Sequence, residues 1–361
     1  MLGLKTIDAY IIRKFLGTFL YAIAIIICIV IIFDISEKLD DFLRTKASLH
    51  SIIFDYYINF IPFFINLFSP LFTFISVIFF TSKMASNTEI VAILSSGVSF
   101  RRFLLPYMMA AAVLATLSFI LINFVIPKAN KKRLEFEESF IRNRYMFNDM
   151  NVHRQIEPGT YIYMESYNNI DNIGFKFALE KIVDGKLKSK LIADNIVWDT
   201  IKHKWQINNY YSRKIYDFKE SIKVGATMDT ILNMHPKDFG TRLNNVETMN
   251  YFELNKFIEK ETMKGSDEVP FFMIEKYQRM SMPFSTFILT LIGVALASRK
   301  VRGGIGLHIG LGILLSFSYI LFMQVANTFA TYGGLHPLIA VWIPNIIFLF
   351  IAILLLRTAP K

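Results

Sequence analysis

The sequence predicts a polytopic α-helical membrane protein with six transmembrane helices and an inserted all-β domain, which is a sandwich, a barrel or a jellyroll. Two patterns support this prediction: long apolar runs occupy both ends of the chain, and short β-prone runs separated by turn signals lie between them. The 361 residues are 53% hydrophobic, their mean hydropathy is +0.41, and Phe alone contributes 35 of them. A soluble core of this size needs fewer apolar residues, so we expect the chain in a bilayer.

Six apolar segments are long enough to cross a membrane as helices. A hydrocarbon core of about 30 Å takes roughly 20 apolar helical residues to cross, because unpaired backbone groups cannot face lipid. The expected spans are residues 15–33, 52–80, 103–126, 280–298, 304–330 and 335–356. A signal peptide is the alternative for the first span, but no small-residue cleavage site follows it, so we expect a retained helix.

The first two spans carry additional patterns. Residues 1–14 place apolar side chains at helical spacing with charged ones between them, which predicts an amphipathic interfacial helix leading into the first span. The second run is too long for a straight crossing and contains Pro62 and Pro70, each of which removes a backbone donor. We expect a tilted or broken helix there, with a re-entrant pair of half-helices as the alternative.

The net charge of +10 is explained by topology rather than by nucleic acid binding. Residues 127–275 hold 23 Lys and Arg against 22 Asp and Glu, so the basic excess belongs to the apolar parts of the chain. In a six-span arrangement these basic residues lie on one side, where the only acids are Asp8 and Glu89. By the positive-inside rule, that side is the cytoplasm and contains both termini. The basic residues are Lys5, Arg13, Lys14, Lys83, Arg101, Arg102, Arg299, Lys300, Arg302, Arg357 and Lys361.

Residues 151–229 are predicted to form an antiparallel β domain outside the membrane. Four pairs of turn residues, at 158–159, 168–169, 184–185 and 199–200, separate runs rich in β-branched and aromatic residues. Helical spacing returns over 248–264 and stops at Gly265. The expected domains are 1–126, with the interfacial helix and three spans, 127–275, with the periplasmic β domain and flanking helices, and 276–361, with three more spans.

The segment 87–102 is a charged, glycine-marked island between the second and third spans. It is long enough for a short helix whose apolar face comprises Ile90, Val91, Ile93 and Leu94. Glu89 lies at the start of this helix, where a carboxylate interacts favourably with the helix dipole, and glycine 97 supplies a stop. Two interpretations are open from the residues alone: a capped surface helix, or a helix docked in a partner ATPase.

Patterns for catalysis, cofactors and metals are absent from the sequence. The GGIG stretch at 303–306 follows no strand and lacks the phosphate-loop spacing, although Gly306 and Gly310 permit close approach of helices. His308 is expected to be a hydrogen-bond partner between helices. Because no strong acid lies deep in a span and no nucleotide site is present, a transporter of this kind takes its free energy from a partner. We expect a non-catalytic subunit without cofactors.

Several segments resemble the LptF/LptG permeases, also called YjgP/YjgQ. They are LKTIDAYIIRKF at the N-terminus, TEIVAILSSGVSFRR, IPK, PGTYIY, DNIVWD followed by a Trp, and HPLIAVWIPN. These segments occur in the family's order along essentially the whole chain. The resemblance implies a subunit of the exporter of lipopolysaccharide in the inner membrane of Gram-negative bacteria. It also implies the partners: a related permease in an LptF/LptG pair, an LptB-type ATPase dimer, and LptC, which passes the lipid to the LptA bridge.

The resemblance also assigns site residues. By position, Glu89 matches the family's coupling-helix glutamate, and Gly97 with Arg101 matches the end of that helix. The residues expected to couple to the ATPase are Glu89, Ile90, Ile93, Leu94, Gly97, Arg101 and Arg102. The family often places basic side chains near the outer end of the first span, and this chain departs from the pattern by offering few. The residues expected to bind lipid are Lys38, Arg44, Lys46, Lys276, Arg279, Phe68, Phe72 and Phe317.

The sequence therefore predicts an ABC-transporter permease that extracts lipopolysaccharide and passes it to periplasmic proteins. One alternative is a membrane-anchored assembly or scaffold protein whose β domain binds partners without transport. A second is a membrane enzyme acting on lipids, which needs an acid, base or nucleophile cluster that the sequence does not show.

Overall fold

The computed structural model describes residues 5–141, 147, 150–216, 219–239, 243–266, 268–299 and 304–358. The chain divides into two compact units, which are described separately. We call the unit formed by Met1–Ile141, Glu247–Tyr251 and Pro270–Lys361 the membrane unit. The unit formed by Arg142–Val246 and Phe252–Val269 is the β unit.

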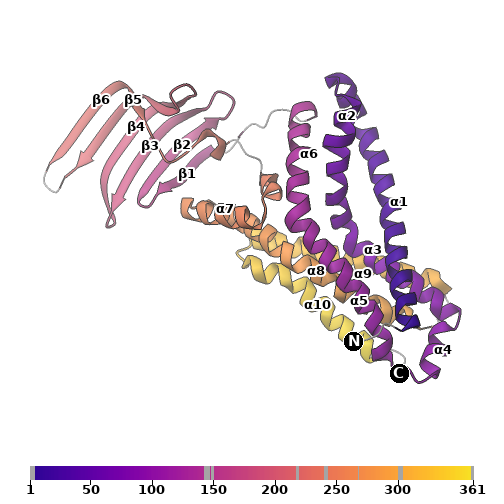
Figure 1. Cartoon of the computed structure of the whole chain (residues 1–361). Helices are drawn as coiled ribbons and strands as arrows, with labels where there is room; N and C mark the ends of the chain where they lie inside the picture. Colours follow the sequence, from indigo (N-terminus) through magenta and orange to yellow (C-terminus); the bar gives the residue numbers. More distant parts are fainter. Residues whose placement is uncertain are drawn as a thin grey trace. The chain divides into compact units, whose positions relative to one another are not determined.

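Six helical stretches of the described residues are long and apolar enough to cross a membrane, as predicted. The second and third stretches each contain a short π-helix. Figure 1 shows the helices of the six stretches. The stretches are α1 (Thr6–Thr45); α2 (Leu49–Ser51), η1 (Ile52–Tyr57) and α3 (Ile58–Ser86); α5 (Phe100–Ile120), η2 (Leu121–Val125) and α6 (Ile126–Phe140); α8 (Val269–Ala297); α9 (Gly304–Tyr332); and α10 (Pro337–Arg357).

The first two stretches differ in detail from the expectations. α1 runs without interruption from Thr6, so the amphipathic N-terminal turn and the first span are one helix, and residues 1–4 lie outside the described residues. The second stretch stays helical through Pro62 and Pro70, which excludes the re-entrant pair of half-helices. The π-helix η1 adds a residue to each turn there, which re-aligns the side chains that follow.

α3 is the central helix of the membrane unit because it contributes to three apolar clusters, one of them through Phe60 near its start. One face of α1, with buried residues at every fourth position from Ile11 to Ile27, packs against Val77 and Phe80 of α3 and against α5. Another face of α3, around Phe74, packs with α8, α9 and α10. The three helices α1, α3 and α5 accordingly lie together in Figure 1.

Close helix approach occurs at glycines other than the predicted pair. A Cβ placed on Gly312 of α9 would lie 2.5 Å from Ile78 Cδ1, and one on Gly293 of α8 would lie 2.8 Å from Val77 Cγ1. A Cβ on Gly306 or Gly310 would meet nothing within 4 Å in the described chain. The helix contacts within the described part of this chain therefore use Gly293 and Gly312, and close approach at Gly306 and Gly310 stays a prediction.

The β unit contains one antiparallel sheet of six strands in sequential order, which is a meander (Figure 1). All four predicted turn pairs fall at the ends of strands or between them, so the prediction of an all-β insertion is confirmed. The strands are β1 (Met150–Glu157), β2 (Thr160–Asn168), β3 (Ile173–Val183), β4 (Lys186–Asp199), β5 (Lys204–Ile215) and β6 (Glu220–Thr230).

The core of the β unit gathers on one face of this sheet. Phe177 and Trp205 are both fully buried there, and the Trp205 indole N–H donates to the Met234 carbonyl at 3.0 Å. The 3-10 helices η3 (Pro236–Asp238) and η4 (Leu243–Thr248) precede α7 (Tyr251–Lys264). α7 is the predicted helix, and it ends at Gly265, whose φ of 68° is left-handed.

Candidate coupling segment and polar clusters of the membrane unit

The predicted coupling segment forms a short helix, α4 (Glu89–Ser95), between α3 and α5. Thr88 precedes it with a left-handed φ of 62°, a conformation that is costly for a β-branched residue. Gly97 follows with a φ of 86°, which explains why glycine stands there. The Ser99 hydroxyl then accepts a hydrogen bond from the Arg102 N–H at 3.3 Å and caps α5. The turn after α4 is therefore defined by the local sequence, whereas the turn before it is formed against the conformational preference of Thr88.

The apolar residues of α4 divide between two faces. Ile90 is 1% exposed and packs, with Ile93 and Leu94, into the cluster shared by α1, α3 and α5. Val91 is 58% exposed and points away from that cluster. Three of the four apolar side chains thus attach α4 to its own chain, and the outward face consists of Val91 and small or polar residues.

Glu89 is joined to the first helix of the membrane unit. Its carboxylate accepts a hydrogen bond from the Tyr10 hydroxyl of α1 at 3.1 Å and another from the Asn87 amide at 3.1 Å. The Lys14 ammonium lies 5.7 Å from the centre of the Tyr10 ring, within reach of a cation–π interaction. The half-buried carboxylate keeps capacity for a further donor, because an ionised carboxylate accepts about four hydrogen bonds.

A second contact joins α1 to the start of α5. Arg102 donates to both Asp8 carboxylate oxygens, at 2.8 and 2.6 Å, in the bidentate geometry that guanidinium groups favour. Asp8 is 3% exposed and also accepts a hydrogen bond from the Lys5 N–H at 3.0 Å. Arg101 is exposed and has no partner among the described residues. The two arginines of the segment therefore have different surroundings.

At the other end of α1, a polar cluster surrounds Asp34. Its carboxylate accepts hydrogen bonds from Tyr56 at 3.1 Å, from Tyr57 at 3.0 Å and from the Lys38 ammonium at 2.6 Å. Lys38 also donates to the Tyr56 hydroxyl and lies 4.8 Å from the centre of that ring. The aromatic rings of Phe42 and Phe60 pack around the cluster. Lys38 is thus held by its own chain.

The remaining basic residues proposed for lipid contact fall into two groups. Arg44 and Lys46 are exposed at the end of α1 and have no partner among the described residues. Lys276 and Arg279 belong to α8. Arg279 is 1% exposed, donates to Glu275 at 3.1 Å and donates to the Met249 carbonyl at 2.7 Å. Its guanidinium has internal partners, whereas Arg44 and Lys46 face outward.

The aromatic residues proposed for lipid contact form a row on α3. Rings at every fourth position touch along the helix, with centroids 4.1 Å apart for Phe60 and Phe64, 6.1 Å for Phe64 and Phe68, and 6.4 Å for Phe68 and Phe72. Phe68 and Phe72 are half-buried, while Phe317 of α9 is 54% exposed. The structure brings the two α3 rings together and places Phe317 on an outward face of another helix.

Comparison with known proteins identifies the family of this arrangement. The family model described as lipopolysaccharide export system permease LptF/LptG matches residues 9–358, nearly the entire chain. The chain belongs to the LptF/LptG family. A search of curated proteins found no match.

Family membership fixes the general role. LptF/LptG proteins are the permease of a lipopolysaccharide export system, so the chain is a multi-pass protein of the inner membrane and the membrane component of a transporter. The system has partner subunits. The resemblance seen in the sequence is thereby confirmed, and so is the predicted architecture of six spans with an inserted β domain.

Polar residues within the spans of this LptF/LptG protein pair helix with helix, as expected. His308 of α9 lies 3.0 Å from the Ser82 hydroxyl of α3. Asn345 of α10 accepts from Tyr319 at 2.9 Å and donates to the Ser281 carbonyl at 3.2 Å. Of the basic loop predicted before α9, Arg299 is described and residues 300–303 lie outside the described residues.

Sequence reasoning missed three site residues: Tyr10, Asp8 and Asp34. A signal for Asp8 was present, because Asp8 and Glu89 are the only acids on the basic side of the spans and each requires a partner. Tyr10 carries no such signal, since a tyrosine near the start of an interfacial helix is ordinary. Asp34 follows the first apolar run directly, where an acid is ordinary, and the structure places it within α1.

Proposed function

We propose that this chain is the permease subunit of an ABC transporter that extracts lipopolysaccharide from the inner membrane and is driven through α4 by an LptB-type ATPase dimer. The observation that carries the proposal is a pair of contacts near α4: Glu89 of α4 with Tyr10, and Arg102 of α5 with Asp8. The first contact joins the short exposed helix to the start of α1, and the second joins the start of α1 to the start of α5.

The contacts provide a mechanical route from α4 into the spans. Ile90, Ile93 and Leu94 pack α4 against the cluster that α1, α3 and α5 share, so a displacement of α4 is transmitted to that cluster. Interiors of this density move as units rather than deform continuously. When the ATPase closes, α4 moves α1 and α5 together and compresses the cavity between this chain and a related permease, which expels the lipid.

The proposed orientation places α4 and both termini in the cytoplasm and the β unit in the periplasm. It is supported by the gathering of basic residues near the α4 end of the spans and by the positive-inside rule. In this orientation residues 1–126 and 276–361 form the two membrane halves and residues 127–275 form the periplasmic domain. The β unit receives the lipid and passes it towards LptC.

Lipid contact is proposed for the outer ends of α1 and α8 and for the α3 aromatic row. Arg44 and Lys46 are the strongest candidates for phosphate contact because both are exposed and unpaired among the described residues. Lys38, Lys276 and Arg279 have nearby partners, so they contact phosphates only if those contacts rearrange. Phe68, Phe72 and Phe317 supply apolar surface for acyl chains.

The test uses the full chain in membranes with its related permease and the ATPase. Glu89→Lys places a positive charge where the proposal puts a basic side chain of the ATPase, and like charges at an interface cost several kcal/mol. Release of lipopolysaccharide driven by ATP should fall by at least about tenfold, because each 1.4 kcal/mol is a factor of ten. Glu138→Lys, which changes an exposed carboxylate on α6, is the matched control.

A milder variant tests the internal link. Tyr10→Phe removes the hydrogen bond to Glu89 and keeps the ring, so release should fall by about fivefold, in keeping with a net hydrogen-bond contribution near 1 kcal/mol. The proposal is wrong if Glu89→Lys leaves both ATPase association and lipid release at the level of Glu138→Lys. That outcome favours a scaffold whose β unit binds partners without transport.

A further inference from the structure

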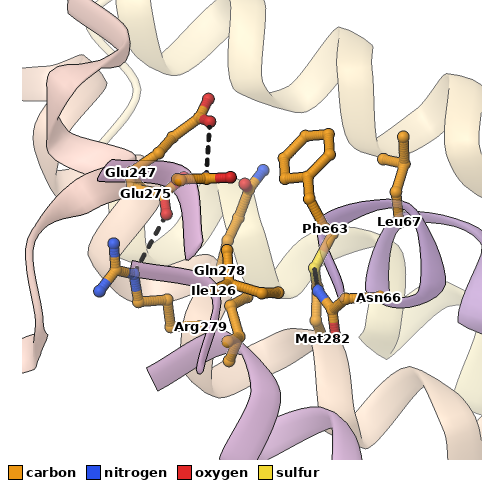
Figure 2. A pocket seen from close by; sticks show the side chains of 11 residues that line it. Phe63, Asn66, Leu67, Ile126, Glu247, Glu275, Gln278, Arg279 and Met282 are labelled. Carbon is orange, nitrogen blue, oxygen red and sulfur yellow. Dashed lines mark hydrogen bonds and ion pairs between the residues drawn. The ribbon is translucent and has the colours of Figure 1, made fainter. Parts of the chain in front are cut away.

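A cavity of about 200 Å³ lies within the membrane unit, between α3, the η2–α6 segment, η4 and α8. Figure 2 shows the side chains that line it. Glu247 and Glu275 come from one side, and Phe63 and Leu67 of α3 come from the other (Figure 2). The cavity is separate from α4 and from the cluster around Asp34, and it shares Arg279 with the outer end of α8 that is proposed above for lipid contact.

One buried group in the cavity wall has an unsatisfied acceptor. Asn130 of α6 is 0% exposed, and its amide nitrogen donates to the Glu247 carboxylate at 3.3 Å. Its Oδ1 atom accepts no hydrogen bond from any described residue. Buried polar atoms nearly always have a partner, and an orphan of this kind requires an explanation. A bound donor in the cavity provides one.

The polar part of the wall is rich in acceptors. Arg279 is the only cation that lines the cavity among the described residues, and its guanidinium is engaged with Glu275 and the Met249 carbonyl. Two carboxylates and one guanidinium therefore line the cavity, and the amide oxygens of Gln278 and Asn130 add further acceptors. A ligand that carries a positive charge and several N–H donors matches this wall, and an anion does not.

The opposite wall is apolar apart from Asn66, whose amide is already engaged: its oxygen accepts a hydrogen bond from Ser118 at 2.6 Å, and its nitrogen donates to the Met282 sulfur at 4.0 Å. Phe63, Ile126 and Met282 line it together with Leu67, which is 45% exposed and opens the cavity to the outside of the unit. A small hydrated cation would leave this wall without a function. An ammonium on an apolar stem fits both walls, with the stem leaving past Leu67.

The depth of the cavity matches the level of lipid headgroups. Ile122 also lines the cavity. The helix that leads to it from Phe100 rises about 33 Å along its axis at 1.5 Å per residue. A hydrocarbon core is about 30 Å thick, so on the proposed orientation the cavity lies where the outer-leaflet headgroups begin. From the other direction, α8 rises about 28 Å between Ala297 and Gln278, which gives the same level.

We propose that this cavity binds the primary ammonium headgroup of an outer-leaflet phospholipid of the phosphatidylethanolamine type. The ammonium donates to the Asn130 oxygen and to the carboxylates of Glu247 and Glu275. The glycerol and the start of the acyl chains lie along Phe63 and Leu67. This lipid is distinct from the transported one and occupies the α3–α6–α8 side of a single subunit.

The test measures lipid retention by the purified full chain in detergent, without ATPase or lipopolysaccharide, by native mass spectrometry. The protein is mixed with equal amounts of phosphatidylethanolamine, phosphatidylcholine and phosphatidylglycerol. Phosphatidylcholine has the same charges but no N–H donor, and phosphatidylglycerol is anionic. We expect phosphatidylethanolamine to be retained about tenfold more than either, the factor for one charge-assisted hydrogen bond. Because no export step is involved, failure of this proposal is distinguishable from failure of the proposed function.

Two variants test the assignment to the cavity. Glu247→Gln removes a charge from the wall, and Gln278→Lys places a tethered ammonium inside it, so each should abolish the preference for phosphatidylethanolamine. Glu138→Gln, on the exposed face of α6, should keep it. Melting temperature verifies that each variant is folded. Equal retention of phosphatidylcholine and phosphatidylethanolamine by the wild type, or an unchanged preference in both folded cavity variants, overturns the proposal.

Discussion

The membrane unit and the β unit are stabilised by opposite means. In the β unit a single apolar core of aromatic and branched residues lies on the sheet, and most of the described ion pairs, such as Lys176 with Glu165 and Arg213 with Glu220, are at the surface. In the membrane unit the ion pairs are inside: Asp8 with Arg102, Arg133 with Glu137, and Arg279 with Glu275 each include a side chain that is at most 10% exposed.

The difference follows from the solvent. Water drives apolar side chains of the β unit together, whereas lipid tails are as apolar as the side chains of the spans and provide no such force. In the spans, packing and polar contacts therefore determine which helices associate. The same amino-acid substitution should therefore lower the free energy of unfolding by different amounts in the two units. The variants below test this difference.

The largest loss of stability is expected for Phe177→Ala in the β unit. Phe177 is fully buried in the sheet core, so the variant loses both the transfer free energy of the ring and the contacts around the cavity, about 4 kcal/mol. Hydrogen exchange of the amides in β3 and β4 of the full chain measures this loss. Phe175→Ala on the same strand, where the ring is 43% exposed, is the control. A cost below that of the control would contradict the assigned core.

The next effect is expected for Asp34→Ala in the membrane unit. Removing this carboxylate leaves the Lys38 ammonium and the hydroxyls of Tyr56 and Tyr57 without their shared acceptor, at a cost of about 3 kcal/mol. Unfolding of the detergent-solubilised chain by a denaturing detergent measures the change. Asp40→Ala, an exposed position on the same helix, should have little effect. If the two variants were equally stable, the cluster would contribute nothing.

Phe74→Ala is the membrane counterpart of Phe177→Ala and is expected to cost less, about 2 kcal/mol. Phe74 is fully buried against α8 and α9, but its ring faces an apolar solvent when the helices separate. The cost of the substitution therefore comes only from the lost packing contacts and the cavity, without a transfer free energy from water. The same detergent titration measures it, with Phe79→Ala, 43% exposed on the same helix, as control. A loss as large as that of Phe177→Ala would remove the proposed distinction between the two units.

The parts of the fold that the sequence predicts are those set by local patterns. The spans follow from apolar length, and the strands follow from turn residues such as Asp184-Gly185, which lies between β3 and β4. Gly97 and Gly265 mark helix ends because the backbone there has a left-handed φ, which glycine adopts without strain. Such a signal can be read from a single residue. Element type and order were therefore accessible without knowledge of the three-dimensional contacts.

The contacts of the candidate site were not accessible in this way, because they join residues that are distant along the chain. Asp8 and Arg102 are 94 positions apart, and Tyr10 and Glu89 are 79 apart. The choice among glycines illustrates the same point, since Gly310 and Gly312 have similar sequence surroundings and only the second meets Ile78. Which surface a side chain reaches depends on the rotation of a helix about its axis, and several rotations satisfy an apolar run equally well.

The smallest effect is expected for Asp238→Asn in the β unit, and it depends on pH. Asp238 accepts a hydrogen bond from the His235 N–H at 2.9 Å and pairs with Lys260 at 3.2 Å and Lys264 at 3.3 Å. Burial by itself raises the pKa of Asp238, but the hydrogen bond and the two ammonium groups outweigh it and hold the pKa below its ordinary value of 3.8. The ionised carboxylate thus attaches α7 to the end of η3.

A carboxyl group whose pKa is lowered on folding stabilises the fold above its ordinary pKa, and this contribution is lost as the pH falls through the lowered value. Asp238→Asn should therefore cost about 1 kcal/mol at pH 7 and at pH 5, and the difference from wild type should shrink below about pH 4. Hydrogen exchange of α7 amides at these pH values measures it. Asp184→Asn, which changes an exposed turn residue, controls for loss of charge. A difference that grows as the pH falls would mean that Asp238 is held in its neutral form, and α7 would then be attached by its apolar face alone.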